Sequence, residues 1–411
     1  MTARLSATEA ARRLGVSLST LYAYVSRGLL GSWPDGASKR HRYDADEVTL
    51  LARRRADAKR AGGVAERSLD WGLPVLESRI TQIANGVLRY RGHDAVALAA
   101  SASLEDVAAL LWDCAPGAVQ AEACLSGFDA ARWRDALREW AGSAPLDRAL
   151  VMLPAAAARL PRVSDSGREA RVEIAAALLR ATVAALAGIV PSMQPAHRQL
   201  AGAWTVRGRA GAGLLRRALV LCADHELNPS TFAVRCIAST GTHLFGAIAG
   251  GLAALSGPRH GGETVLARAL LDEAGRAADL DRYLAARLAQ DMREAGGRTR
   301  LAGFGHPLYP AGDPRAAALI EALRVAMPRH AALRVGLDVA ARVEAASGER
   351  PTIDFALALL ERVLALPDGA AFVLFAAGRV TGWIAHALEQ QHDGKLIRPR
   401  ARYVGTDATP A

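Results

Sequence analysis

The stretch SGPRHGGETVLARALLDEA, residues 256–274, places one histidine in a glycine-framed loop that runs directly into a helix. Glycines on both sides of His260 let another molecule approach the backbone closely, and the positive end of the helix expected from Thr264 to Ala274 disfavours protonation of the imidazole. A neutral imidazole in such a place can donate a hydrogen bond to a carbonyl and polarise it. Taken alone, the segment also fits a glycine-rich structural turn.

A second histidine, His225, stands in DHELNPST, residues 224–231. Asn228 and Pro229 are typical of the N-cap and first residue of a helix. We expect this helix to continue to about Leu255 and, because it is rich in Gly and Ala, to pack closely against other backbones. An ordinary loop histidine is the alternative interpretation of His225.

Two more segments place polar residues in apolar surroundings. GFGHPLYPAGDPRA, residues 303–316, holds His306 on another loop framed by glycines. PTIDF, residues 351–355, places Asp354 at a helix start, where a simple N-cap is the alternative.

Arg379 is the only residue among Asp, Glu, Lys and Arg between Asp368 and Glu389. An unpaired guanidinium within an apolar helix costs roughly several kcal/mol, so this position calls for an anion. A substrate carboxylate and an internal salt bridge are the two alternatives.

The composition favours helices over sheets. Of the 411 residues 51% are apolar but only 5% are aromatic, Ala, Leu and Arg dominate, and β-branched runs are scarce. The length favours two or three domains. We therefore expect a mainly α protein.

The net charge and the cysteines limit the kinds of partner, metal site and compartment that we expect. A formal net charge of +10 suits anionic partners such as nucleic acid, CoA or dicarboxylates. The four cysteines form no CxxC pair and read as small buried hydrophobes, and no clustered His, Cys and carboxylate set predicts a metal. Residues 1–16 lack the apolar segment of a signal peptide and no uncharged apolar stretch reaches about 18 residues, so we expect a soluble, cytoplasmic protein without membrane contact.

The first 62 residues predict a small helix-turn-helix module. Ser6–Glu9 is a capping box that opens a helix closed by Gly15, Ser17 caps a second helix from Leu18 to Arg27, and a basic strand precedes a third helix that runs to about Lys59. The stretches LSATEAARRLGVSLSTLYAYVSRGLL and RHRYDADEV resemble the winged helix-turn-helix of the MerR and excisionase families. That resemblance implies duplex DNA as a partner. The recognition helix would carry Ser19, Thr20, Tyr22 and Tyr24, and the wing that contacts phosphates would carry Lys39, Arg40 and Arg42. A protein-contact module is the alternative.

The four downstream segments, in this order and spacing, resemble the citrate synthase family. DHELNPST, SGPRHGG, GFGHPLYPAGDPRA and PTIDF match its characteristic segments, as do IANGVLRYRG near residue 83 and the arginine-bearing GRVTGWIAHALEQ and LIRPRARYVG at the C-terminal end. Several motifs in one order are far more specific than any single one.

The resemblance implies a two-domain helical fold and a homodimer. A composition shift near Ala61-Gly62-Gly63 sets the winged helix-turn-helix in residues 1–62 and a linker in 63–70. The resemblance places a large domain in 71–260 and 360–411, and a small domain in 261–359 that closes over the large one.

The same resemblance implies a reaction: condensation of an acyl-CoA, with acetyl-CoA as the leading donor, with oxaloacetate to give citrate and CoA, without a cofactor. His260 would hold the thioester carbonyl, Asp354 would take the proton from the adjacent carbon, and His306 would polarise the keto group. The acceptor's oxygens would be bound by His225, Arg315 and Arg379, with Arg398 reaching in from the partner subunit.

Two departures from the family pattern put the acyl substrate in question. Pro307-Leu308 stands where Arg-Val is usual, and Glu263-Thr264 where an Ala-Asn pair is usual. A 2-methylcitrate synthase that uses propionyl-CoA is therefore an alternative. A DNA-binding transcription regulator whose citrate synthase-like body senses a metabolite is another, because a fold does not decide function.

Overall fold

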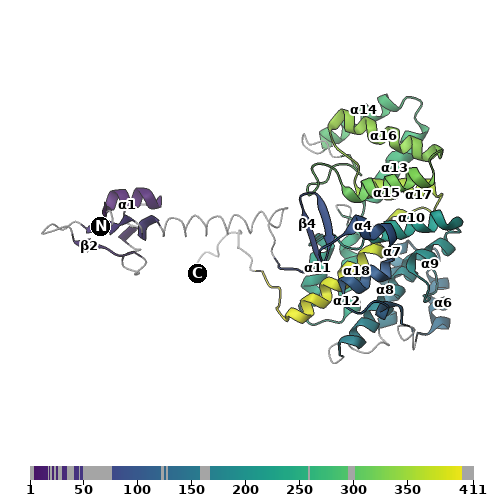
Figure 1. Ribbon diagram of the computed structural model, residues 1–411, viewed down its shortest axis with the longest axis horizontal. Coiled ribbons are helices and arrows are strands. Elements are labelled where there is room, and N and C mark those ends of the chain that lie inside the picture. The colour runs from purple at the N-terminus through teal and green to yellow at the C-terminus, as the bar shows by residue number, and fades with distance from the viewer. Residues whose placement is uncertain are drawn as a thin grey trace, which may run out of the picture. The chain divides into compact units, whose positions relative to one another are not determined.

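The computed structural model describes residues 4–16, 18, 21–22, 25, 30–34, 41–45, 47–49, 76–121, 125, 128–157, 167–257, 260–294 and 301–399. The chain divides into two compact units, Met1–Glu77 and Ser78–Ala411. Figure 1 shows the elements of each unit. The expected limits at residues 62, 63 and 70 lie outside the described residues and stay predictions, as does the division of the second unit into two domains.

The N-terminal unit joins one well-capped helix to a small antiparallel sheet. Strand β1 (Arg4–Ser6) leads into helix α1 (Ala7–Leu14), and β2 (Trp33–Pro34) and β3 (His41–Asp44) complete the sheet in the order β1-β3-β2. The predicted capping box is confirmed, because Ser6 and Glu9 bond each other's backbone, and so is the left-handed Gly15 at φ 63°. These caps satisfy backbone groups that a short helix leaves open.

Of the residues expected to meet DNA, two are described. Tyr22 lies in a helical segment with 53% of its side chain exposed, and Arg42 lies on β3 opposite Ser6 and Trp33. The remaining candidates lie outside the described residues: Ser19, Thr20, Tyr24, Lys39 and Arg40.

The second unit begins with a three-stranded antiparallel sheet, β4 (Thr81–Ala84), β5 (Val87–Tyr90) and β6 (His93–Asp94), in that order. Asn85 and Gly86 both have positive φ, 53° and 73°, the backbone of a two-residue hairpin turn whose twist matches its strands. The rest of the described unit is helical, as the composition predicted. Its helices are α4 (Ala95–Ser101), α5 (Leu104–Leu111), the 3-10 turn η1 (Ala118–Gln120), α6 (Ala130–Glu139), α7 (Pro145–Ala157), α8 (Arg168–Ala187), α9 (Ala196–Ala203), α10 (Gly208–Leu221), α11 (Pro229–Ala238), α12 (Leu244–Leu255), α13 (Glu263–Arg276), α14 (Leu280–Glu294), α15 (Pro314–Ala326), α16 (Ala331–Ser347), α17 (Ile353–Val363) and α18 (Ala370–Asp393).

Helix α18 forms the centre of this unit and contacts α8, α10, α11, α12 and α17 (Figure 1). Its glycines permit close backbone approach: a Cβ at Gly378 would lie 2.6 Å from the carbonyl oxygen of Leu219, and one at Gly382 would lie 2.5 Å from that of Ala223. Among the described helices only α18 has the length and hydropathy of a membrane span, and 89% of that window is buried within the unit. It is accordingly a core helix.

One expected helix is wrong. The stretch from Asn228 to Leu255 forms two helices, α11 and α12, because Gly241 takes a left-handed φ of 80° and His243 caps α12 with its Nδ1 at 3.0 Å from the N–H of Gly246. The predicted N-cap at Asn228 is confirmed. The expected close packing is found as well, since a Cβ on Gly251 would lie 2.7 Å from Val234.

Candidate active site

Two of the sequence-predicted histidines meet at one place. The rings of His225 and His306 lie edge to face, 5.0 Å between centroids, although 81 positions separate them in the chain. Nε2 of His225 lies 3.0 Å from the hydroxyl of Tyr309, and Nδ1 of His306 accepts the N–H of Leu308 at 3.2 Å. Burial lowers the pKa of His225 well below 6.5, and the nearby Arg315 lowers it further, so this ring is neutral near pH 7.

His260 stands beside a buried serine. Its Nε2 lies 2.7 Å from Oγ of Ser230, whose oxygen lies 2.7 Å from Oδ1 of Asn228 and accepts the indole N–H of Trp383 at 3.2 Å. Ser230 has one hydroxyl proton and two competing acceptors. When that proton goes to His260, the remaining ring proton sits on Nδ1 and can be donated to another group.

The pKa of His260 is lowered to about 4 by burial and by the charge of Arg379. His260 is therefore a neutral imidazole at neutral pH, as expected from its place ahead of a helix, although the causes are burial and Arg379. A neutral ring with a free N–H is the form that can polarise a carbonyl without first losing a proton.

Arg315 and Asp313 form a buried bidentate pair at the start of α15. Nε and Nη2 of Arg315 lie 2.9 and 2.8 Å from the two carboxylate oxygens. Burial alone would lower the pKa of Arg315, but the carboxylate of Asp313 outweighs it and raises that pKa above its ordinary value. Asp313 also accepts the N–H of Ile353 at 3.0 Å, which fixes α17 against this pair. Arg315 lies 5.5 Å over the ring of Tyr309.

Arg379 on α18 is 1% exposed and has no carboxylate partner among the described residues. Its Nε donates to the carbonyl of Cys222 at 3.0 Å, and its guanidinium carbon lies 4.8 Å over the ring of Phe375. Burial lowers its pKa. Of the two alternatives left open by the sequence, an internal salt bridge is not found among the described residues, although the charge of Asp224 acts on Arg379, and an anion from outside the chain fits the observation.

Asp354 is the second residue of α17, and Thr352 is the N-cap, so the simple N-cap interpretation of Asp354 is wrong. Its Oδ2 lies 3.4 Å from the hydroxyl of Thr352. Burial and the negative charge of Glu263 raise its pKa from 3.8 to about 6, against the opposing charge of Arg315. A carboxylate with a raised pKa is a stronger base than one in water.

These residues share one electrostatic environment. Arg315, His306, Arg379 and His260 all disfavour protonation of His225, and the charges of Arg379, Arg315 and Asp354 act on the buried Cys222 thiol. Arg398 differs: its side chain is exposed, and it makes no hydrogen bond or ion pair with the described residues. Among the described residues no group of three His, Cys, Asp or Glu side chains could hold a metal.

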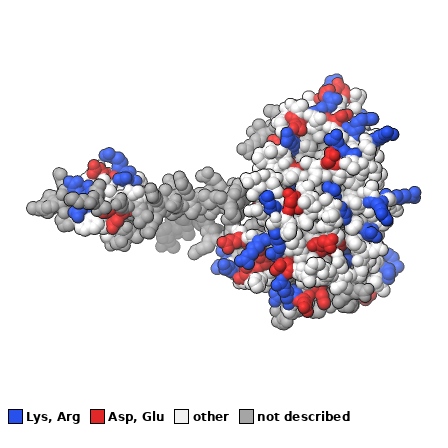
Figure 2. All heavy atoms as spheres, in the orientation of Figure 1, with Lys and Arg blue, Asp and Glu red and all other residues white. Residues whose placement is uncertain are grey.

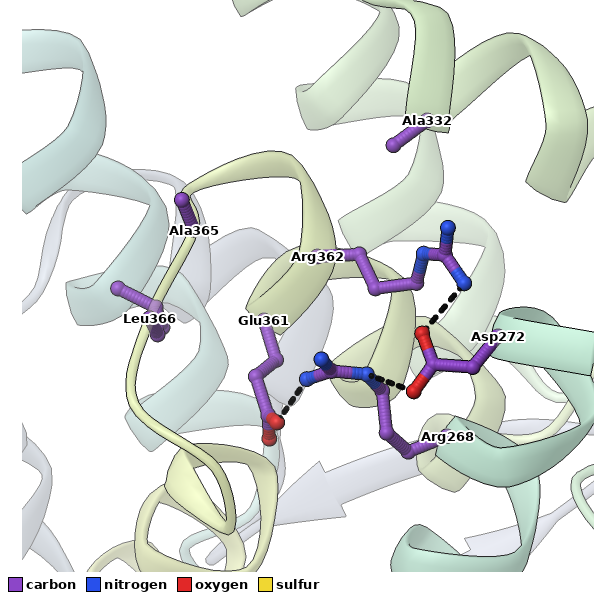
Figure 3. Close-up of a pocket in the computed structure, with 7 residues that line it drawn as sticks. All are labelled: Arg268, Asp272, Ala332, Glu361, Arg362, Ala365 and Leu366. Carbon is purple, nitrogen blue, oxygen red and sulfur yellow. Dashed lines mark hydrogen bonds and ion pairs between the residues drawn. The ribbon is translucent and has the colours of Figure 1, made fainter. Parts of the chain in front are cut away.

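A separate cavity of about 350 Å³ lies beside α13, α16 and α17, and none of the candidate site residues lines it. Figure 3 shows Arg268 between Glu361 and Asp272, with Arg362 bonded to the other oxygen of Asp272. Glu361 also accepts the N–H of Ala371 at 2.7 Å. This network joins α13, α17 and α18. His260 precedes α13, Asp354 lies on α17 and Arg379 lies on α18.

Comparison with known proteins finds two family models that match this chain. Residues 68–400 match the family model described as citrate synthase, C-terminal domain. The chain belongs to the citrate synthase family. Residues 4–56 match a helix-turn-helix domain, which supports the interpretation of the N-terminal unit.

Relatives and solved structures agree with the family. Citrate synthase 2 of Bacillus subtilis is 35% identical over 199 residues, 46% of this chain and 50% of that protein, and the citrate synthase of Haloferax volcanii is 37% identical over 47% of this chain and 51% of that protein. The chain thus spans about half the length of these curated relatives. The 2-methylcitrate synthase of Mycobacterium tuberculosis is 29% identical over 77% of this chain and 84% of that protein.

Two solved structures share the fold of the citrate synthase family. Citrate synthase of Thermotoga maritima has a TM-score of 0.67 at 25% identity and covers 83% of this chain and 96% of its own. A ternary complex of carboxymethyl coenzyme A and oxaloacetate with citrate synthase of Thermoplasma acidophilum has the same TM-score and identity, and covers 84% and 97%.

Sequence reasoning missed Ser230 and Tyr309 as partners of the site histidines. Both were part of the quoted segments DHELNPST and GFGHPLYPAGDPRA, but a hydroxyl carries no pattern of its own in a sequence. Asp313 was quoted without a role, although an Asp two residues before an Arg at a helix start is a signal for the pair observed.

Proposed function

We propose that this chain catalyses the condensation of an acyl-CoA, with acetyl-CoA as the leading donor, with oxaloacetate, followed by hydrolysis of the thioester to citrate and CoA. The observation that carries the proposal is Arg379, a buried cation that forms no ion pair with a carboxylate of the described residues, beside two neutral histidines. A dianionic acceptor supplies the missing charge, and guanidinium forks match its carboxylates in geometry.

Carbon acids require a base and an electrophile together. Asp354 takes a proton from the carbon beside the thioester carbonyl while the N–H of His260 stabilises the oxygen of the developing enol. The new carbon nucleophile attacks the keto carbon of oxaloacetate, and His306 polarises the keto oxygen that receives the electron pair. Water then cleaves the thioester and releases CoA. His225, Arg315 and Arg379 hold the acceptor.

The test is the release of CoA thiol by the purified chain given oxaloacetate and acetyl-CoA. We expect release that depends on oxaloacetate and is lost in Asp354→Ala and His260→Ala variants that remain folded by circular dichroism. Oxaloacetate-independent release, or equal release by the Asp354→Ala variant, contradicts the proposal.

Propionyl-CoA giving 2-methylcitrate is the second candidate reaction. It is favoured by the similarity to a 2-methylcitrate synthase over 77% of this chain and by Leu308, whose side chain is 38% exposed two residues from His306. The ratio of kcat/KM for propionyl-CoA to that for acetyl-CoA decides between the two donors.

We further propose that the N-terminal unit binds duplex DNA, so that the protein also acts as a regulator. The helix-turn-helix match and the exposed Tyr22 favour this. The helix-turn-helix match over residues 4–56 assigns the contact to the first unit. On the face of the second unit seen in Figure 2, basic and acidic side chains are interspersed. We expect binding that weakens steeply with salt and is reduced by Tyr22→Ala. An affinity for duplex DNA that changes neither with salt concentration nor with Tyr22→Ala would contradict this proposal and favour a protein-contact module.

A homodimer is part of the proposal, with Arg398 completing the site of the partner subunit and the small domain, residues 261–359, closing over the large one. The exposure of Arg398 supports a role outside its own chain. Light scattering should give twice the monomer mass of 43.2 kDa. Arg398→Ala should then raise the KM for oxaloacetate without altering that mass.

A further inference from the structure

Glu263 occupies a junction that the proposed mechanism does not use. It is the first residue of α13, three residues after His260. Its Oε2 accepts the backbone N–H of Gly303 at 3.3 Å. Gly303 begins the loop that carries His306, so this one side chain joins the His260 segment to the His306 loop.

The same loop is held on its other side by α17. Gly303 has a left-handed φ of 83°, and a Cβ there would lie 3.0 Å from that of Ala267 and 3.1 Å from that of Phe355. Its carbonyl accepts the N–H of Thr352 at 2.8 Å, and the hydroxyl of Thr352 approaches Asp354. A path of hydrogen bonds thus leads from Glu263 to the segment of the proposed base.

Charged groups act on Asp354 from two neighbouring elements. The start of α15 presents Asp313 and Arg315, whose opposite charges are bonded to each other, and α13 presents Glu263. The Cys222 thiol at the end of α10 is neutral because burial raises its pKa to about 12. Burial raises the pKa of Asp354 most, and Glu263 is the charged group that raises it most after burial.

We propose that Glu263 is a positioning residue of the site, which anchors the His306 loop to α13 through Gly303 and places a second negative charge near Asp354. This inference rests on the proposed function. Its consequence is a base that holds its proton more firmly than an isolated aspartate, since a neighbouring negative charge disfavours the ionised form of Asp354. The matching observation is the pKa of Asp354, which burial and then the charge of Glu263 raise to about 6.

The substitution Glu263→Gln tests the charge separately from the anchor, because an amide oxygen can still accept the N–H of Gly303. Glu263→Ala removes both. We expect the acid limb of kcat/KM against pH to move down by about one pH unit in Glu263→Gln, with the KM for oxaloacetate little changed. Glu263→Ala should show the same shift and an additional fall in kcat of about tenfold, as the His306 loop loses its anchor.

The matched control is Glu273→Gln on the same helix, which removes an exposed carboxylate bonded to Tyr283 and should leave the acid limb in place. A second measurement needs no turnover: ¹³C NMR of labelled aspartate carboxyls, with Asp354 assigned from the Asp354→Asn spectrum. The titration midpoint of Asp354 should be lower in Glu263→Gln than in the wild type.

An unchanged midpoint of Asp354 in Glu263→Gln overturns this inference whether or not the protein turns over. A wild type without oxaloacetate-dependent thiol release sinks the proposed function, while a lowered midpoint in the same protein still supports the coupling of the two carboxylates. An acid limb that moves equally in Glu273→Gln would show a general charge effect and also overturn the inference.

Discussion

The substitution Asp354→Asn should abolish turnover and at the same time stabilise the fold at neutral pH. Asp354 has an ordinary pKa of 3.8 in an unfolded chain and about 6 in the folded protein, because burial and Glu263 disfavour the ionised form. The folded state therefore binds the proton more tightly, and stability falls as pH rises from about 4 to about 6. Above pH 6 the full cost of holding the carboxylate ionised remains.

The size of that cost follows from the rise in pKa. Each pKa unit corresponds to about 1.36 kcal/mol, so the carboxylate costs about 3 kcal/mol of unfolding free energy at pH 7.5. A negative charge in the first turn of α17 interacts favourably with the helix dipole, and the neutral amide of Asn lacks this interaction. This loss offsets part of the gain in unfolding free energy. We expect a net stabilisation of about 1–3 kcal/mol.

Urea unfolding of both proteins at pH 4.5 and at pH 7.5 measures the effect. The variant should be clearly more stable at pH 7.5, with a smaller difference at pH 4.5. Asp147→Asn, an exposed carboxylate in the first turn of α7, is the control and should show no pH-dependent gain. A variant that is less stable than the wild type at pH 7.5, or a difference that is the same at both pH values, refutes the reasoning.

Three further outcomes follow from the described contacts. Gly382→Ala places a Cβ 2.2 Å from Oδ1 of Asp224, so chemical denaturation should show a loss of about 3 kcal/mol or more, and wild-type stability would contradict the close packing of α18. Arg379→Gln should raise the KM for oxaloacetate about 100-fold with little effect on the KM for acyl-CoA. Equal effects on both KM values would contradict the placement of Arg379 in the acceptor site. Ser230→Ala should lower kcat about 10- to 100-fold through His260, while an unchanged kcat would exclude the tautomer argument.

The sequence alone predicted the class of the fold and the segments of the candidate site. Helix starts at Ser6 and Asn228 were readable because a cap is a contact between residues two or three positions apart. The glycine-framed histidines and the lone charge of Arg379 were readable because each breaks a local pattern of apolar residues. The break after Ala238 was missed, since its signal is a single left-handed Gly241 in a run that otherwise suits a helix.

Only the tertiary structure decided what these residues meet. The contact of His260 with Ser230 and the bond from Glu263 to Gly303 each join residues 30 or more positions apart. That no carboxylate of the described residues forms an ion pair with Arg379 depends on every neighbour at once. Such contacts are set by how helices pack, and packing depends on the shapes of many side chains together. The sequence by itself determined which residues could take part in the chemistry, and the fold determined their protonation and their partners, because both depend on burial and on charges brought together from distant segments.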